Sequence, residues 1–194
     1  MILETFILAL IAGYLFKGNL KNLAQTSLRG AGFIFGGLIL RNIPVLFKLP
    51  FLKILLDNSK YIAPVLFLIS FILLGIGVFL NISRWPMIIV LIGVFLNFLA
   101  VLTNKGYMPV SKDSLEWAGY DMARITSNQL DMNHVLITPQ TNFPFLTDIF
   151  AIPRPYPFPQ LLSIGDLAMC LGLFVFIVTQ MRPKKISTNV KPEI

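Results

Sequence analysis

The sequence predicts an all-α integral membrane protein with about five transmembrane helices and one long ordered extracytoplasmic loop between helices four and five. Hydrophobic residues make up 56% of the 194 residues and charged residues 13%, whereas charged residues are about 25% of a soluble domain. The apolar residues form runs long enough for the roughly 17–25 helical residues that cross a bilayer. We expect a single transmembrane domain, residues 1–181, and a basic cytoplasmic tail, residues 182–194.

The net charge of +7 raises the question of a nucleic-acid partner. In a membrane protein, Lys and Arg near helix ends set the orientation and meet anionic headgroups, so we expect the lipid bilayer as partner and no nucleic acid. The single cysteine, Cys170, lies inside an apolar run. No intramolecular disulfide can form with one cysteine.

The first two expected spans are residues 2–16 and 28–43. The first has no positive region before it, because its nearest cations, Lys17 and Lys21, come after it. It is therefore interpreted as a retained helix with its N-terminus outside, and not as a signal peptide. The second span contains Gly32 and Gly36 in a GxxxG spacing, which predicts close packing against another helix.

Residues 41–60 are broken by two prolines and space three lysines among apolar residues. That composition is typical of a segment in the membrane interface, where ammonium groups reach the headgroups. Whether the segment is interfacial or re-entrant stays open. It suggests an anionic lipid headgroup as a further partner.

The third and fourth spans are expected at residues 61–80 and 85–103, as antiparallel neighbours joined by a very short link. Pro86 suits the first turn of the fourth helix, where a missing N–H costs little. Asn97 lies about midway along that helix. A buried amide needs a partner, so we favour an interhelical hydrogen bond over a transport site.

The outer loop, residues 104–163, carries most of the chemically varied side chains. Ser111, followed by acids at 113 and 116, predicts the start of a short amphipathic helix that extends to about residue 125. Four alternating prolines surround Arg154 and predict an extended, polyproline-like strut, read as a stiff spacer in preference to a recognition ligand.

The last span is expected at residues 164–181. Ser163 and Asp166 have the spacing of a capping box at its start, in which the two side chains satisfy free backbone N–H groups. An intramembrane proton carrier is the alternative for Asp166. The capping role is preferred because a carboxylate in a first turn also suits the helix dipole.

Positive charge favours a C-terminus in the cytoplasm and an N-terminus outside. The inner side would receive a larger number of short-loop cations than the outer side, although the lysines of residues 41–60 oppose this bias. We therefore expect a multi-pass protein whose two ends lie on opposite sides of the membrane.

The chain resembles a bacterial family of small multi-pass membrane proteins of unknown function, the Domain of Unknown Function 5317 family. The resemblance rests on Asn104-Lys105-Gly106-Tyr107-Met108-Pro109-Val110, on Thr147-Asp148-Ile149 and on Ser163-Ile164-Gly165-Asp166. The family pattern usually has glycine at the positions of Lys105 and Thr147. The resemblance implies a fold, an outer-loop signature and a bacterial cytoplasmic membrane, and no catalytic residues.

The sequence gives little support to an enzyme. His134 is the single histidine, which excludes HExxH and multi-histidine metal sites, and we expect neither a metal nor a cofactor. A Ser–His–Asp set could be written from Ser111 or Ser114 with His134 and Asp148, but no GxSxG motif supports it. Catalysis therefore stays open, with a non-enzymatic role favoured.

The favoured hypothesis is a subunit, assembly factor or scaffold that uses its outer loop to bind another membrane or envelope protein. The alternative is a lipid-handling carrier or a headgroup-directed enzyme at the outer leaflet, with Asp148, Asp166, Arg154 and His134 at its site. The candidate structural or binding residues are Asn97, Asn104, Gly106, Met108, Pro109, Asp148, Arg154, Ser163, Gly165 and Asp166.

Overall fold

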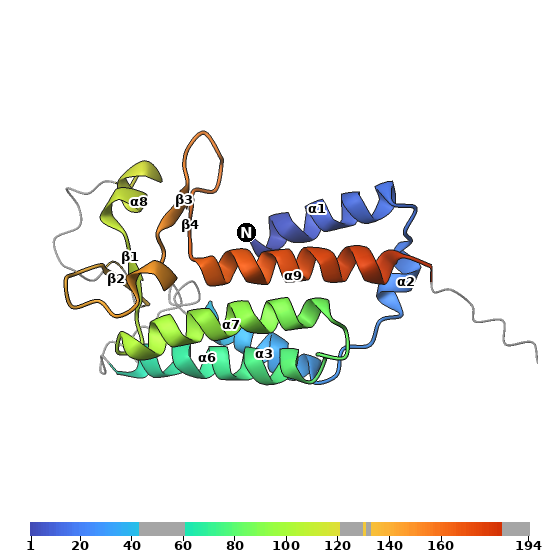
Figure 1. The fold of residues 1–194 in the computed structure, drawn as a ribbon, viewed down its shortest axis with the longest axis horizontal. Coiled ribbons are helices and arrows are strands. Elements are labelled where there is room, and N and C mark those ends of the chain that lie inside the picture. The colour runs from blue at the N-terminus through green and yellow to red at the C-terminus, as the bar shows by residue number, and fades with distance from the viewer. Residues whose placement is uncertain (43–60, 121–129, 131–132, 184–194) are drawn as a thin grey trace, which may run out of the picture.

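The computed structural model describes residues 1–42, 61–120, 130 and 133–183. Six helices form a bundle, and the remaining elements form a cap at one end of it (Figure 1). The bundle helices are α1 (Ile2–Leu15), α2 (Leu20–Ala24), α3 (Ala31–Arg41), α6 (Ile62–Phe79), α7 (Pro86–Thr103) and α9 (Ile164–Met181). The expected interfacial segment, most of the expected tail and the expected end of the amphipathic helix lie outside the described residues.

Three helices of the described part are long and apolar enough to cross a membrane: α6, α7 and α9, with 18 residues each. Their bounds agree with the expected third, fourth and fifth spans to within one residue. Helices α1 and α3 are apolar but shorter, with 14 and 11 residues, below the roughly 17 residues that a straight helical crossing needs.

The tightest helix contact joins α7 to α9. A Cβ atom built on Gly93 would lie 2.5 Å from the Gly165 carbonyl oxygen, and one on Gly172 would lie 2.7 Å from the Val90 backbone nitrogen. Such distances leave no room for a side chain, so the two helices touch through their backbones. Close backbone approach at small residues is how apolar helices associate in a membrane.

The expected packing role of Gly32 and Gly36 needs correction. A Cβ atom on Gly32 would meet nothing within 4 Å, and one on Gly36 would meet only Leu73 at an ordinary 3.7 Å. The close contact between α3 and α6 is made by Gly37, whose Cβ would lie 2.7 Å from the Ser70 carbonyl oxygen. The GxxxG spacing was correct for a helix but indicated the wrong face.

The cap is the described part of residues 104–163. Its elements are β1 (Met108–Val110), α8 (Lys112–Trp117), β2 (His134–Leu136), the 3-10 helix η2 (Pro144–Leu146), β3 (Phe150–Ile152) and β4 (Gln160–Leu162). Strands β1 and β2 are parallel, and β3 and β4 are antiparallel. The described part of the chain is mostly helical, as expected, but the all-α prediction is corrected by the four three-residue strands of the cap.

The expected proline strut is also corrected. Phe150 pairs with Leu162, and Ile152 with Gln160, so the chain reverses between them and the prolines lie in a hairpin loop. The start of the amphipathic helix is confirmed, since the Ser111 side chain accepts from the Ser114 backbone N–H at the start of α8.

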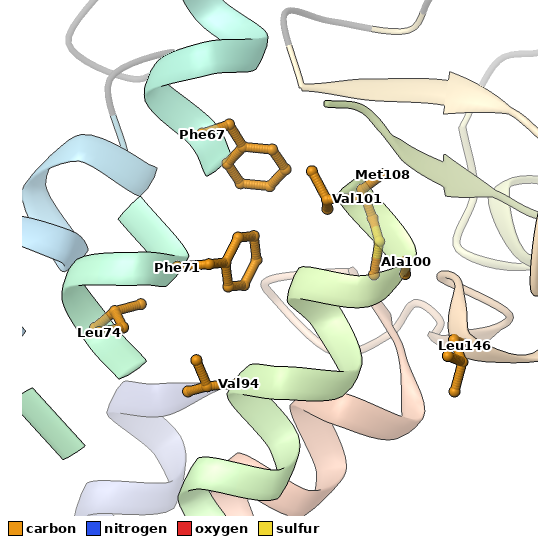
Figure 2. Close-up of a cluster of buried hydrophobic side chains, with 8 residues drawn as sticks. All are labelled: Phe67, Phe71, Leu74, Val94, Ala100, Val101, Met108 and Leu146. Atoms are coloured by element: carbon orange, nitrogen blue, oxygen red, sulfur yellow. The ribbon is translucent and has the colours of Figure 1, made fainter. Parts of the chain in front are cut away.

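The core joins the cap to the bundle. Phe67, Phe71 and Leu74 of α6 face Val94, Ala100 and Val101 of α7, and Met108 of β1 and Leu146 of η2 extend this cluster toward the cap (Figure 2). Phe67 and Phe71 meet edge to face, with ring centroids 5.2 Å apart. Burial of Met108 and Leu146 to 3% and 5% exposure anchors the cap on the helices through the same apolar cluster.

Candidate functional site

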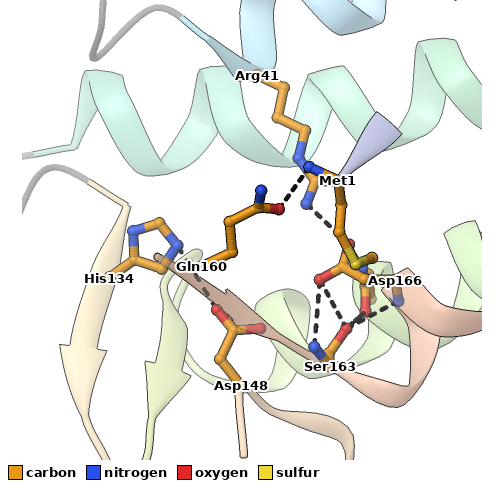
Figure 3. A network of polar contacts seen from close by, with 8 residues as sticks. Met1, Arg41, His134, Asp148, Gln160, Ser163 and Asp166 are labelled. Carbon is orange, nitrogen blue, oxygen red and sulfur yellow. Dashed lines mark hydrogen bonds and ion pairs between the residues drawn. The ribbon is translucent and has the colours of Figure 1, made fainter. Parts of the chain in front are cut away.

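The start of α9 carries the capping box that the sequence predicts. The Ser163 hydroxyl oxygen accepts from the Asp166 backbone N–H at 3.0 Å, and the Asp166 carboxylate accepts from the Ser163 backbone N–H at 3.2 Å (Figure 3). Two backbone donors that a helix start leaves open are satisfied in this way. Ser163 is completely buried, so the capping box lies inside the protein.

Asn97 of the neighbouring helix α7 forms hydrogen bonds with both residues of the capping box. The Ser163 hydroxyl donates to Asn97 Oδ1 at 2.7 Å, and Asn97 Nδ2 donates to Asp166 Oδ1 at 3.0 Å. Gly165 permits this approach, because a Cβ at this position would overlap the Asn97 amide. The expected interhelical hydrogen bond of Asn97 is therefore present, and it ends on the capping residues.

Arg41 brings a third helix to the same carboxylate. It lies in the last turn of α3, and its Nη2 is 3.2 Å from Asp166 Oδ1. The guanidinium also lies over the Phe71 ring, 5.0 Å from the centroid, a favourable cation–π arrangement. Asp166 is thus a capping residue, an amide acceptor and an ion-pair partner at once. Sequence analysis missed Arg41, whose signal was a cation at the end of an apolar span.

A second set of polar side chains lies beside this network, on the first turn of α1. Gln160 of β4 and Tyr156 both donate to Glu4 Oε1, and the Met1 amino group contacts Glu4 and Gln160. Partial desolvation and then the bond to the Glu4 carboxylate raise the pKa of the Tyr156 phenol above its usual value. The hairpin of β3 and β4 is fastened to α1 by these contacts.

His134 and Asp148 form a separate polar pair in the cap. Both residues lie beside β1, since His134 of β2 pairs with Met108 and Asp148 makes an isolated bridge to Val110. The side chains meet with His134 Nε2 3.7 Å from Asp148 Oδ2, on the far side of Gln160 from Asp166 (Figure 3). A pocket of about 350 Å³ lies beside them, bounded by Leu115, Tyr120 and Leu161 among others.

The catalytic triad written from the sequence is not assembled from the serines that were considered. The Ser114 hydroxyl donates to the Ile149 carbonyl at 2.6 Å, and Ser111 caps α8. Within the described ranges, no group of three His, Cys, Asp or Glu side chains could hold a metal ion.

The signature after α7 serves to turn the chain. Gly106 has φ +87°, and a Cβ there would lie 2.6 Å from the Pro64 side chain, so both its backbone and its surroundings require glycine. Asn104 donates to the Asn142 carbonyl and accepts from the Asn142 backbone N–H, each at 2.9 Å. Pro109 and Met108 are buried. These residues connect the cap to the bundle.

Arg154 lies on the cap surface. Its side chain lies against Gly119, where an added Cβ would meet Arg154 Nε at 3.5 Å. A shallow pocket of about 220 Å³ adjoins it, lined also by Tyr120 and Pro159. Trp117 and Phe158, which neighbour the lining residues Ala118 and Pro159 in sequence, have 66% and 65% of their surface exposed. We call Trp117, Tyr120, Arg154 and Phe158 the cap aromatic surface.

Asn81 was missed by sequence analysis. It is completely buried at the end of the bundle opposite the cap, where it accepts from the Arg29 backbone N–H and donates to the Arg29 carbonyl. Arg84 donates to the same amide at 2.9 Å. In the sequence Asn81 stands in a short polar link, where burial has no local signal.

The comparisons with known proteins agree with the resemblance noted in the sequence. A family described as "Family of unknown function (DUF5317)" matches residues 25–178. An uncharacterized protein of Thermotoga maritima is 26% identical over 182 residues, which cover 94% of this chain and 93% of the relative. No solved structure gives a significant match. The chain belongs to the DUF5317 family.

Proposed function

We propose that the protein crosses a bacterial cytoplasmic membrane five times, with the cap and the N-terminus outside. The support is the course of the helices: α1, α6 and α9 begin at the cap end, and α3 and α7 end there. Several cations lie at or near the opposite end, as expected of a cytoplasmic side: Lys17, Lys21, Arg29, Arg84 and Arg182. Local thinning of the bilayer would accommodate the shorter α1 and α3.

We further propose a non-enzymatic function, in which the cap binds another membrane or envelope protein as a subunit, assembly factor or scaffold. The observation that carries this proposal is the cap aromatic surface. Trp, Tyr and Arg are the residues that dominate binding energy in protein interfaces. Here Tyr120 and Arg154 line a shallow pocket, and Trp117, next in sequence to the lining residue Ala118, is exposed. Met108 and Leu146 pack on the bundle, and Asn104 donates to the Ala100 carbonyl of α7. These contacts hold the cap in place, which lowers the ordering cost of binding.

Site-specific photocrosslinking in cells tests this function. A benzoylphenylalanine at Trp117 or Phe158 keeps an aromatic side chain at the surface, and the same residue at Gln140 is a control on an exposed part of the cap outside that surface. We expect one discrete protein adduct from Trp117 and Phe158, absent from Gln140, and lost when Arg154→Ala is added at unchanged protein level. Adducts that are equal at all three positions, or that contain only lipid, would contradict the proposal.

Lipid handling is the second candidate function, and a specific observation favours it. A groove between α1, α3 and α9 has apolar walls and ends at Arg41, Gln160 and Asp166. By contrast, the residues expected for a headgroup-directed enzyme do not converge as one set. Asp166 is engaged by Arg41 and Ser163, and His134 and Asp148 form a separate pair.

A further inference from the structure

The groove between α1, α3 and α9 has two chemically different parts. It encloses about 590 Å³. Leu3 and Phe6 of α1, Leu38 of α3 and Met169 of α9 supply hydrocarbon along its length, while Arg41 and Gln160 lie at its cap end. Because α1 packs on α9 and α3 packs on α6, the two shorter helices leave the surface of α9 open between them.

Arg41 makes the polar end of the groove cationic. Its partner Asp166 also accepts from the Asn97 amide and the Ser163 backbone N–H, so the negative charge of that carboxylate is shared among several donors. The Arg41 side chain keeps 25% of its surface exposed. A guanidinium has five N–H donors, so it can hold a second anion beside Asp166.

The depth of the polar end matches a headgroup. Asp166 is in the first turn of α9 and Arg41 in the last turn of α3, so both lie at the cap-side ends of apolar helices. The hydrocarbon part of the groove then lies at the depth of the acyl chains. The Glu4 carboxylate near this end is engaged by Tyr156 and Gln160, which reduces its repulsion of an anion.

We propose that the groove binds an anionic phospholipid of the outer leaflet, with a phosphate at Arg41 and an acyl chain against Phe6, Leu38 and Met169. Arginine suits phosphate because two of its N–H groups can meet two phosphate oxygens. The amides of Asn42 and Gln160 also line the groove. Each donates one N–H within the protein, to Leu38 and to Glu4 respectively, and has a second N–H for the ligand. The inference rests on the second candidate function and is independent of the cap aromatic surface.

Photoactivatable lipid in nanodiscs tests the proposal on the full chain. The discs contain phosphatidylcholine with a small fraction of phosphatidylglycerol that carries a diazirine on its acyl chain, and adducts are mapped by mass spectrometry. We expect adducts at Phe6, Leu38 and Met169 to exceed those at Ile92 and Phe95 by roughly tenfold, a preference of about 1.4 kcal/mol. The latter two are exposed residues of α7. Unlabelled phosphatidylglycerol should remove this excess, and added phosphatidylcholine should not.

Two groove variants and two controls complete the test. Leu38→Trp fills the apolar part, whereas Ile39→Trp adds the same ring at a neighbouring position that is 59% exposed. Arg41→Gln removes the cation and Arg41→Lys keeps it. We expect the excess of groove adducts to be lost in Leu38→Trp and Arg41→Gln and kept in both controls, with cap crosslinking at Trp117 unchanged in all four.

Several results would overturn the inference. One is uniform labelling of all lipid-facing helices. A second is removal of the groove excess by added phosphatidylcholine as completely as by unlabelled phosphatidylglycerol. A third is a groove excess that survives in both Leu38→Trp and Arg41→Gln. If Leu38→Trp fails to fold, the comparison of groove adducts between Arg41→Gln and Arg41→Lys is sufficient to test the proposal. If the excess of lipid adducts in the groove is absent while protein crosslinking from position 117 persists, the groove proposal is wrong and the cap proposal is unaffected.

Discussion

At the residue scale, the turn after α7 places two neighbouring residues in left-handed backbone conformations. Lys105 has φ +60° and Gly106 has φ +87°. Glycine adopts such conformations without steric cost, whereas other residues pay for them. The turn bends the chain from α7 into β1. Lys105 therefore keeps the shape of the turn at a cost in stability.

Replacing Lys105 by glycine should stabilise the protein. We expect Lys105→Gly to raise the free energy of unfolding by about 1 kcal/mol, because a non-glycine residue in this region is strained by that order. Lys21→Gly, inside α2, is the control and should lower it by about 1 kcal/mol, since glycine is a poor helix former. Titration of mixed micelles with dodecyl sulfate measures both. A loss of stability in Lys105→Gly would contradict the strain.

The hydrogen bonds between Asn97 and Asp166 should appear as coupling between the two residues. Hydrogen bonds between membrane helices contribute about 0.6 kcal/mol on average and up to about 1.7 kcal/mol. We expect a double-mutant cycle of Asn97→Ala and Asp166→Ala to give a coupling in that range. Asn81→Ala with Asp166→Ala is the control, because these residues lie at opposite ends of the bundle and should be additive to about 0.5 kcal/mol. Additivity in the first pair would refute the network.

At the element scale, local sequence patterns predicted where the helices lie, but not which strands pair or which helix faces meet. The last helix was predicted at residues 164–181, as observed, because Ser163 and Asp166 define its start within four residues of sequence. Strand β1 pairs Met108 with His134, and no local pattern reveals three-residue strands joined across such a separation. Gly32 and Gly36 show a further limit, since spacing alone does not tell which side of a helix meets a neighbour.

The glycines of the bundle should differ sharply in their tolerance of alanine. We expect Gly93→Ala to lower the free energy of unfolding by about 1–3 kcal/mol, the cost of overpacking, because its Cβ would meet the Gly165 carbonyl oxygen. Gly32→Ala is the matched control; it fills open space and should be neutral or stabilising by up to about 1 kcal/mol. Mixed-micelle unfolding compares the two. An equal loss at Gly32 would show that α3 packs through its GxxxG face after all.

At the scale of the whole molecule, both ends of the bundle are fastened by polar contacts. Asp166 joins α3, α7 and α9 at the cap end, and Asn81 joins the segment before α3 to the link between α6 and α7 at the other end. The sequence predicted Asn97, Ser163 and Asp166 as candidates. It could not bring Arg41 to Asp166 across 125 residues, nor show the groove, because both depend on how helices without sequence adjacency are arranged.

The crossing of the membrane with the cap outside is the central claim, because the proposed partner binding by the cap and the proposed outer-leaflet lipid both depend on it. Labelling of intact cells with a membrane-impermeant maleimide tests it most directly. In a Cys170→Ser background, one cysteine is placed at Gln140 in the cap or at Ser27 near the opposite end, both exposed positions. We predict that Gln140→Cys is labelled in intact cells and that Ser27→Cys is labelled only after lysis. Labelling of Ser27→Cys in intact cells, or protection of Gln140→Cys until lysis, would contradict the account.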